Sequence, residues 1–525
     1  MTKYLLSRLA RGLLSIIIVV AIVMLLIYSG LDRNQIFASD PNYSHLKLNA
    51  KEQYKLQQWE KYGYLDYVPY ADYLKGLLTS GEITQEKYNE VVTFAKTADK
   101  DSEAVAEYVS KFTEYYEAQG YTVERVPGST LPNSNKYKEG GNPLLYAYKD
   151  IPVIQRLFSY ITGIFTVDNI NYVKDDIEDR GLTFTLFDPS YGGEKFSPAI
   201  MGNGTRHKYI LYFDSQFPYI HQNLLKINLG TSYSVNRDID VFTTMTQAQG
   251  SFENSIVTYP SGLVAESADN LHSATYVSGS LANGTIAVKD RFVDDYTNVT
   301  TYKSGLSKIG YSFVIGIISV VASYLLAIPL GTLMARKKDK LVDKLGTIYI
   351  VFIIAVPSLA YIFLFQSIGR AVGLPAVFDT VNPTWLMYIL PIVSLALPSV
   401  AGLMKWLRRY MIDQMNSDYV KFARASGLSE GEIFTKHIFK NAAIPIVHGI
   451  PGSVLGALIG AIITERVYVV PGAGNLLTQA INAYDNGVIV GVTLFYALLS
   501  VISIILGDIL MSMVDPRISF STKAR

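Results

Sequence analysis

Long apolar runs lie at both ends of the chain, and a long polar stretch separates them. Ile, Val, Leu, Ala and Gly dominate Leu13–Leu31 and 306–511, whereas 32–305 is rich in Tyr, Asp, Lys, Asn and Gly. A helix of about 20 apolar residues crosses a bilayer. The first run is longer than the core of a signal peptide and ends without a small-residue cleavage motif. We therefore interpret it as an uncleaved spanning helix.

The second apolar region divides into five further candidate spans, which gives six in total. They are expected at 311–335, 346–369, 385–404, 446–468 and 487–511. Several contain proline, which membrane bundles tolerate because neighbouring groups satisfy the freed carbonyls. The pair Pro451-Gly452 predicts a kink in the fifth span rather than its loss.

Basic residues between the spans predict the orientation. They cluster before the first span, between the second and third, between the fourth and fifth, and after the sixth. The other short loops hold only Arg370 and Arg466. Since Lys and Arg favour cytoplasmic loops, both termini are expected in the cytoplasm and 32–305 outside the cell. The predicted organisation has four parts. The cytoplasmic N-terminus and the first span cover 1–31, and the external domain covers 32–305. The other five spans cover 306–511 and include the cytoplasmic loop 408–445, and a cytoplasmic tail covers 512–525.

The external segment has the pattern of a mixed α and β domain. Helical periodicity covers 46–118. After Gly120 short β-branched and aromatic runs are bounded by turn residues. Strands are expected at Tyr121–Val126, Thr183–Phe187, Tyr209–Phe213, Ser255–Tyr259 and Thr285–Lys289. Clustered tyrosines fit either a docking surface or the rim of an ordinary core. The sequence leaves both interpretations open for the clustered tyrosines, which include Tyr62, Tyr64, Tyr67, Tyr70 and Tyr73.

The cytoplasmic segment 408–445 predicts two short helices that meet at a glycine. Ser417 and Asp418 offer an N-cap for a helix from Tyr419 to Ser426, and Gly427 can end it. Ser429 and Glu432 have capping-box spacing for a second helix. A compact knob of this kind can move with a soluble partner. Alternatively, the segment is a plain basic loop.

The residues of this segment resemble the EAA loop of ABC importer permeases, in the spacing typical of the dipeptide and oligopeptide group. The matching positions are Asp418, Tyr419, Ala423, Arg424, Ala425, Gly427, Leu428, His437, Asn441 and Pro445. Ser426 and Phe422 depart from the usual pattern. The resemblance implies that these residues couple the chain to an ATPase subunit.

Further motifs extend the same resemblance toward the C-terminus. The run from Glu465 through Pro471-Gly472 to Gly474 is similar to a family element, with Arg466 departing. Structural or gating roles are implied at the matched positions: Glu465, Pro471, Gly472, Gly474, Asp508, Asp515, Pro516 and Arg517. Asp485, Gly491 and the run Asn228–Ser232 also match. Asp508 either packs against a neighbouring helix or reaches water at the end of its span.

The family implies an α-helical polytopic fold of the type I importer permease, with a large mixed α/β extracellular domain inserted between helices 1 and 2. Long external domains of this kind resemble the Ami-type permeases of Gram-positive bacteria. The implied role is one permease subunit for oligopeptides in the cell membrane. The implied partners are a second related permease, two ATPases, a lipid-anchored peptide-binding protein, membrane lipid and the peptide.

Composition narrows the remaining chemistry. The chain has no cysteine and a net charge of +1, so neither thiolate sites nor nucleic-acid binding is indicated. No G-x-x-x-x-G-K-[ST] run occurs, so ATP and magnesium are expected on partner chains, and no catalytic or metal site is predicted here. Other cargo, such as nickel or a signalling peptide, stays open. A membrane sensor or a membrane enzyme would need an output domain or a catalytic cluster that the sequence does not offer.

Overall fold

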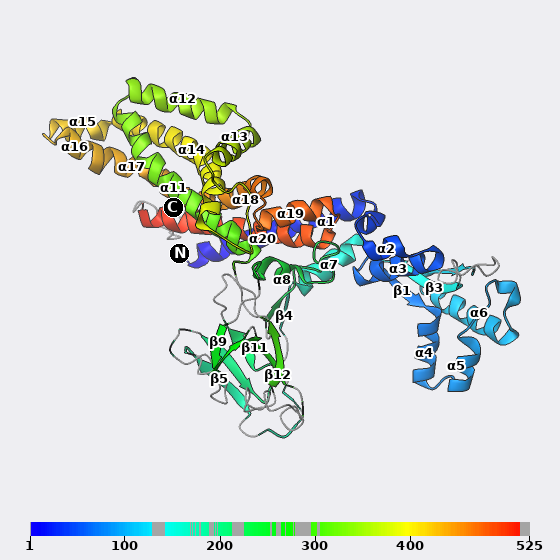
Figure 1. Cartoon of the computed structure of the whole chain (residues 1–525). Coiled ribbons are helices and arrows are strands. Elements are labelled where there is room, and N and C mark those ends of the chain that lie inside the picture. The colour runs from blue at the N-terminus through cyan, green and yellow to red at the C-terminus, as the bar shows by residue number, and fades with distance from the viewer. Residues whose placement is uncertain are drawn as a thin grey trace.

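The chain is described here from a computed structural model, drawn in Figure 1. The structure describes residues 2–128, 142–167, 181–187, 199–212, 225–251 and 305–514, with shorter pieces between 170 and 304. The predicted strand at 285–289 and the predicted tail residues Asp515, Pro516 and Arg517 lie outside the described residues.

Apolar helices form one of the two main parts of the molecule. Within the described residues, five helices are long and apolar enough to cross a membrane, and a bent pair could supply a sixth span. The five are α1 (Thr2–Gly30), α11 (Lys308–Arg336), α14 (Ile389–Met415), α18 (Ile450–Tyr468) and α20 (Asn486–Val514). They cover five of the expected segments. A short 3₁₀ turn at Trp385–Tyr388 leads into α14.

The expected span at 346–369 is not one continuous helix. It consists of α12 (Leu341–Ala355) and α13 (Ser358–Ala371), which are bent by 108°. Pro357 causes the break, because it lacks an N–H and forces the preceding Val356 into an extended conformation, as its φ of −86° and ψ of 130° show. Proline is tolerated in other spans: Pro329 and Pro398 lie inside α11 and α14.

Small residues let the central helices approach closely. At Gly331 of α11 an added Cβ would lie 3.3 Å from the Cα of Met404 in α14. Gly316 of the same helix faces Leu458 of α18 in a similar way. Since lipid is as apolar as leucine, such packing contacts rather than apolar burial hold membrane helices together. The resulting core joins α11, α13, α14 and α18, and a second core joins α1, α19 (Ala473–Asn482) and α20.

The polar segment begins with a compact lobe of helices on a small sheet. Strand β3 (Leu144–Asp150) lies between β1 (Leu65–Pro69) and β2 (Thr122–Val126), and both pairs are antiparallel. The helices are α2 (Pro41–His45), α3 (Leu48–Lys61), α4 (Tyr70–Ser80), α5 (Gln85–Val91) and α6 (Glu103–Ala118), after a 3₁₀ turn at Arg33–Phe37.

Four of the clustered tyrosines are buried, either inside this lobe or where it meets the helical bundle. Tyr62, Tyr64, Tyr67 and Tyr70 are buried, and Tyr70 packs edge-on against Phe112 of α6. Burial raises the pKa of the Tyr67 hydroxyl to about 12. The core interpretation of these four residues is therefore confirmed, and the docking-surface interpretation is wrong for them.

A second group of strands follows, and it forms small separate sheets. Strand β6 (Ala199–Asn203) lies between β5 (Gly181–Thr185) and β7 (Tyr209–Tyr212). Two hairpin-like pairs are β9 (Ser255–Thr258) with β10 (Val264–Ser267), and β11 (Asp269–Tyr276) with β12 (Tyr296–Thr301). The strands expected at 121–126, 183–187, 209–213 and 255–259 are thus confirmed within two residues at each end.

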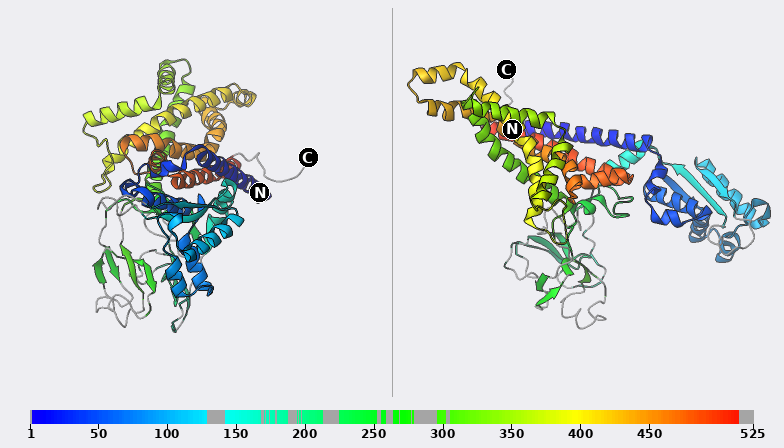
Figure 2. Two further views of the ribbon diagram at one scale, coloured as in Figure 1. Left: turned by 90° about the vertical axis from the view of Figure 1, so that its right-hand side faces the viewer. Right: turned by 45° about the horizontal axis from the view of Figure 1, so that its top comes forward.

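Between the lobes, a few elements rest on the helical bundle. These are α7 (Val153–Gly163), the pair β4 (Phe165–Val167) with β8 (Leu225–Ile227), and α8 (Val241–Thr246). Figures 1 and 2 show the first lobe beyond one end of α1 and the α15–α16 tip at the other end of the molecule. The N-terminus and the C-terminal end of α20 lie together on the side of that tip.

Candidate functional site

The segment between α14 and α18 folds as a helical hairpin. It contains α15 (Asp418–Ala425), α16 (Glu430–Glu432), a π-helix η5 (Ile433–Phe439) and α17 (Lys440–His448). Gly427 joins the two arms with a φ of 79°. This left-handed conformation suits glycine, so the predicted glycine stop is confirmed.

Local caps explain where the arms begin. Ser429 accepts a hydrogen bond from the Glu432 amide, and the Glu432 carboxylate accepts from the Ser429 amide, which confirms the predicted capping box. At the first arm the sequence prediction is only half right. Ser417 holds the N-cap position, but its hydroxyl donates to the Gln414 carbonyl instead of capping α15.

The π-helix is a feature that the sequence analysis missed. It follows directly on α16 and interrupts the second helix that the capping box predicted. Wider π turns occur mostly as short interruptions at functional sites. His437 lies within it and is half-buried, and its carbonyl faces the hydroxyl of Tyr419 at 3.5 Å. Tyr419 also donates a 2.6 Å hydrogen bond to Gln414, so it links the two arms to the end of α14.

The hairpin packs as one unit with the ends of the bundle helices. Val420 and Ala423 of α15 share a buried cluster with Ile433 and Ile438 of η5 and with Met411 of α14. Ala335 at the end of α11 and Ala442 of α17 complete the same cluster. A push on the hairpin would therefore be transmitted to several helices at once.

The tip of the hairpin is exposed and carries apolar groups. Phe422 is 72% exposed and Leu428 is 39% exposed. Ala425, Ser426 and Gly427 between them are also exposed. A large exposed aromatic at the end of a projecting hairpin is typical of an anchor for a protein partner.

Charge pairs flank this apolar tip. Arg424 donates to Glu430 at 2.7 Å across the glycine turn, and Lys421 donates to Asp418 at 2.8 Å. The Arg424 guanidinium lowers the pKa of the Glu430 carboxyl, and Lys421 lowers the pKa of Asp418. Both carboxylates thus stay ionised at neutral pH, and the tip presents paired charges of both signs.

Two residues that match the family pattern, Asn441 and Pro445, lie in α17, away from the tip of the hairpin. Asn441 is half-buried and Pro445 is exposed within α17. The helix continues through Pro445 and breaks at Gly449, where α18 begins at Ile450. This break lies two residues before the Pro451-Gly452 pair, at which a kink was predicted.

A second cluster surrounds Glu465 near the far end of α18. Glu465 is fully buried and accepts hydrogen bonds from the Ser312 hydroxyl at 2.5 Å and the Asn475 amide at 2.9 Å. A Cβ on Gly472 would overlap the Glu465 carboxylate, and a Cβ on Gly474 would overlap Ile462. The two glycines of the Glu465–Gly474 motif are therefore required for close approach, and the carboxylate caps the start of α19.

A third cluster joins the bundle to the polar segment through Asp485. This fully buried carboxylate precedes α20. The amides of Tyr233, Ser234 and Val235 donate to it at 2.8, 2.9 and 3.0 Å, and the Ser232 hydroxyl donates at 2.6 Å. The loop that follows the matched run Asn228–Ser232 is thus fixed to the end of the bundle, mainly through the Asp485 carboxylate.

Asp508 lies near the end of α20, where it contacts the first helix. Arg8 donates to it at 2.8 Å, and Tyr4 donates to the same oxygen at 3.0 Å. Asp508 therefore makes the helix-packing contact that one of its two interpretations expected, and a gating role stays a prediction. A similar pair that the sequence analysis missed joins Asp343 of α12 to Arg408 of α14 through two hydrogen bonds.

Comparison with known proteins defines the class. Residues 327–520 match the model of a protein family described as "Binding-protein-dependent transport system inner membrane component". An oligopeptide transport system permease protein, AmiC, from Streptococcus pneumoniae is 35% identical over 528 residues, covering 100% of this chain and 99% of its own. The chain belongs to this family of ABC importer permeases.

Shorter relatives share only part of the chain. The dipeptide transport system permease protein DppB of Lactococcus lactis is 30% identical over 226 residues, which is 42% of this chain and 73% of its own. A structure titled as inward facing conformations of the MetNI methionine ABC transporter is 13% identical, with a TM-score of 0.33, and covers 39% of this chain and 93% of that one.

Proposed function

We propose that the chain is one half of the membrane pore of an ATP-driven importer for oligopeptides. The observation that carries the proposal is the hairpin at Asp418–His448, whose exposed apolar tip continues through a buried cluster into α11 and α14. Its last helix, α17, leads directly into α18. Full-length similarity to an oligopeptide transport system permease supports the cargo.

The proposed complex contains a second, related permease chain and two ATPase subunits, which bind and hydrolyse ATP with magnesium. A lipid-anchored peptide-binding protein of a Gram-positive cell delivers peptide to the polar segment 32–305, which faces the outside. Both termini and the hairpin face the cytoplasm. This orientation rests on the distribution of Lys and Arg between the spans.

Transport then follows from rigid coupling. Closure of the ATPases moves the hairpin, and the hairpin moves the helices that share its cluster. The Glu465 cluster holds the C-terminal end of α18 to its neighbours, and the Asp485 cluster holds the N-terminal end of α20. Tilting of the helices therefore opens the pore alternately to each side. Motions of this kind take place in microseconds to milliseconds.

The test is a substitution at the tip. Phe422→Asp removes the exposed aromatic and should weaken binding of the ATPases, because a buried aromatic anchor contributes about 2 kcal/mol, roughly 30-fold in affinity. The measurement is the amount of ATPase subunit that co-purifies with the tagged chain, together with peptide uptake. Because Phe422 lies outside the buried cluster, folding of the chain should not change.

Tyr115 supplies the matched control. It is also an aromatic side chain and is 54% exposed, but it lies on α6 of the first lobe. Tyr115→Asp should leave ATPase co-purification unchanged. If Phe422→Asp retained as much ATPase as Tyr115→Asp and the parent chain, the hairpin tip would not be the site of contact.

A further inference from the structure

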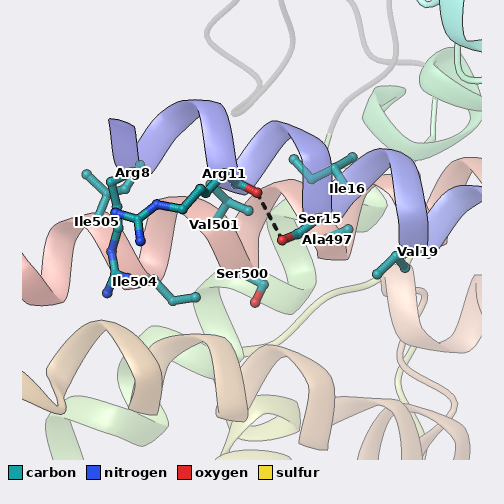
Figure 3. Close-up of a pocket in the computed structure, with 11 residues that line it drawn as sticks. Arg8, Arg11, Ser15, Ile16, Val19, Ala497, Ser500, Val501, Ile504 and Ile505 are labelled. Carbon is teal, nitrogen blue, oxygen red and sulfur yellow. Dashed lines mark hydrogen bonds between the residues drawn. The ribbon is translucent and has the colours of Figure 1, made fainter. Parts of the chain in front are cut away.

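A groove between α1 and α20 lies at the end of the bundle where the termini meet. Figure 3 shows it between the two helices, with Arg8 and Arg11 at one end and Val19 and Ala497 at the other. It encloses ≈ 220 Å³. Close approach of the helices at Gly12, where a Cβ would overlap Val501, sets the floor of the groove.

The charged end of the groove has an excess of positive charge. Arg8 is paired with Asp508 at 2.8 Å. Arg11 donates a hydrogen bond of 3.3 Å to the Ser7 carbonyl, and within the described residues no carboxylate pairs with it. This end of the groove therefore carries two cations and one carboxylate, so the group that complements it is an anion.

Apart from Ser15 and Ser500, the rest of the groove is apolar, and it runs along the helices. Ile16 and Val19 of α1 line it together with Val501 and Ile504 of α20. Arg8 and Val19 are separated by about 16 Å at 1.5 Å per residue. This length matches half of a hydrocarbon core that is about 30 Å thick.

The surface around the groove also faces lipid. The side chains of Leu13, Leu14 and Ile18 on α1 are exposed to about half of their area. The groove therefore has the features of a phospholipid site. Its cationic end lies at the level of the head groups, and its apolar part is about as long as one leaflet is thick. Basic pockets between spanning helices bind anionic head groups in the same way.

We propose that this groove binds one anionic phospholipid of the cytoplasmic leaflet. The phosphate accepts hydrogen bonds from Arg11, and an acyl chain lies along Ile16, Val19 and Ile504. The assignment to the cytoplasmic leaflet rests on the proposed orientation of the chain, but the site itself does not depend on the cargo. The bound lipid would hold α1 against α20 beside the Arg8–Asp508 pair.

The experiment is native mass spectrometry of the complete transporter, extracted from vesicles of equal phosphatidylglycerol and phosphatidylcholine. The parent complex should retain phosphatidylglycerol in preference to phosphatidylcholine. Arg11→Ala should reduce the retained phosphatidylglycerol about fivefold, since one interfacial arginine contributes roughly 1 kcal/mol toward anionic lipid. Ser500→Trp, which fills the groove without changing its charge, should reduce it as well.

Arg409 provides the matched control, because it is exposed near the same end of the bundle and lies over Trp406 of α14. Arg409→Ala should leave the retained lipid unchanged. An equal loss in Arg409→Ala and Arg11→Ala would mean diffuse attraction and would overturn the site. The site would also be overturned if both lipids were retained equally, or if inorganic phosphate displaced the retained lipid. The same holds if no lipid were retained because a second permease chain covers the groove. Uptake is measured separately, so failure here leaves the proposed function untouched.

Discussion

At the scale of single residues, buried carboxylates join segments that are far apart in the chain. Asp485 binds the loop at Ser232–Val235, and Glu465 binds Ser312 and the start of α19. Sequence similarity marked both acids, but it could not give their partners. The partners of Asp485 lie about 250 positions away, and no local pattern encodes such a distance.

Replacement of Asp485 by Asn tests the first of these clusters. The Asn side chain keeps the size of the carboxylate but loses its charge and one acceptor oxygen, while four backbone amides still point at the site. We expect Asp485→Asn to cost about 3 kcal/mol, because hydrogen bonds to a charged group are each worth about 1.5–3 kcal/mol. The measurement is thermal unfolding of the purified chain, read as the temperature at which 32–305 becomes accessible to protease.

Asp413→Asn is the control for this substitution. Asp413 is exposed near the end of α14, and a surface change of this kind is usually within about 0.5 kcal/mol. If Asp485→Asn and Asp413→Asn unfolded at the same temperature, the Asp485 carboxylate would not hold the loop to the bundle.

At the scale of elements, the sequence predicts structure well where the signal is local. The turn at Gly427 and the capping box at Ser429 each depend on residues within one helical turn, and both are confirmed. The π-helix at Ile433–Phe439 and the 108° bend at Pro357 were missed. Hydrophobic periodicity cannot distinguish a π turn from an α turn over seven residues. Proline marks where a helix can break, while packing decides whether it does.

The glycine turn gives the element-scale prediction. Gly427 has a φ of 79° and no atoms within 4 Å of an added Cβ, so a substitution there is strained but does not clash. A β-branched residue at positive φ is a genuine outlier that costs about 1–3 kcal/mol. Gly427→Val should therefore change the angle between the two arms and lower peptide uptake per ATP hydrolysed in reconstituted vesicles.

Gly431 allows a matched comparison. It is also exposed, it also has open space around an added Cβ, and it lies in the first turn of α16 with an ordinary helical conformation. Gly431→Val should keep the ratio of uptake to hydrolysis of the parent complex. An unchanged ratio in Gly427→Val as well would count against a coupling role for the turn.

At the scale of the whole molecule, composition predicts the division into lipid-facing and water-facing parts. Five described helices match expected spans, and the polar segment contains both helices and strands as expected. Its division into two lobes was not predicted. The first lobe has a core of its own, and it is followed along the chain by α7 and α8, which pack on the bundle. An amphipathic helix has the same pattern whether it covers a soluble core or a membrane bundle.

The absence of cysteine from the sequence allows a direct test of the orientation. Single cysteines can be placed at exposed sites at the two ends of the molecule: Ser80→Cys at the end of α4 in the first lobe, and Ser426→Cys in the hairpin. A membrane-impermeant maleimide added to intact cells should label Ser80→Cys and leave Ser426→Cys unlabelled. After the membrane is made permeable, both should react to a similar extent, because both side chains are exposed. Labelling of Ser426→Cys in intact cells would place the hairpin outside, where no ATP-driven subunit could reach it.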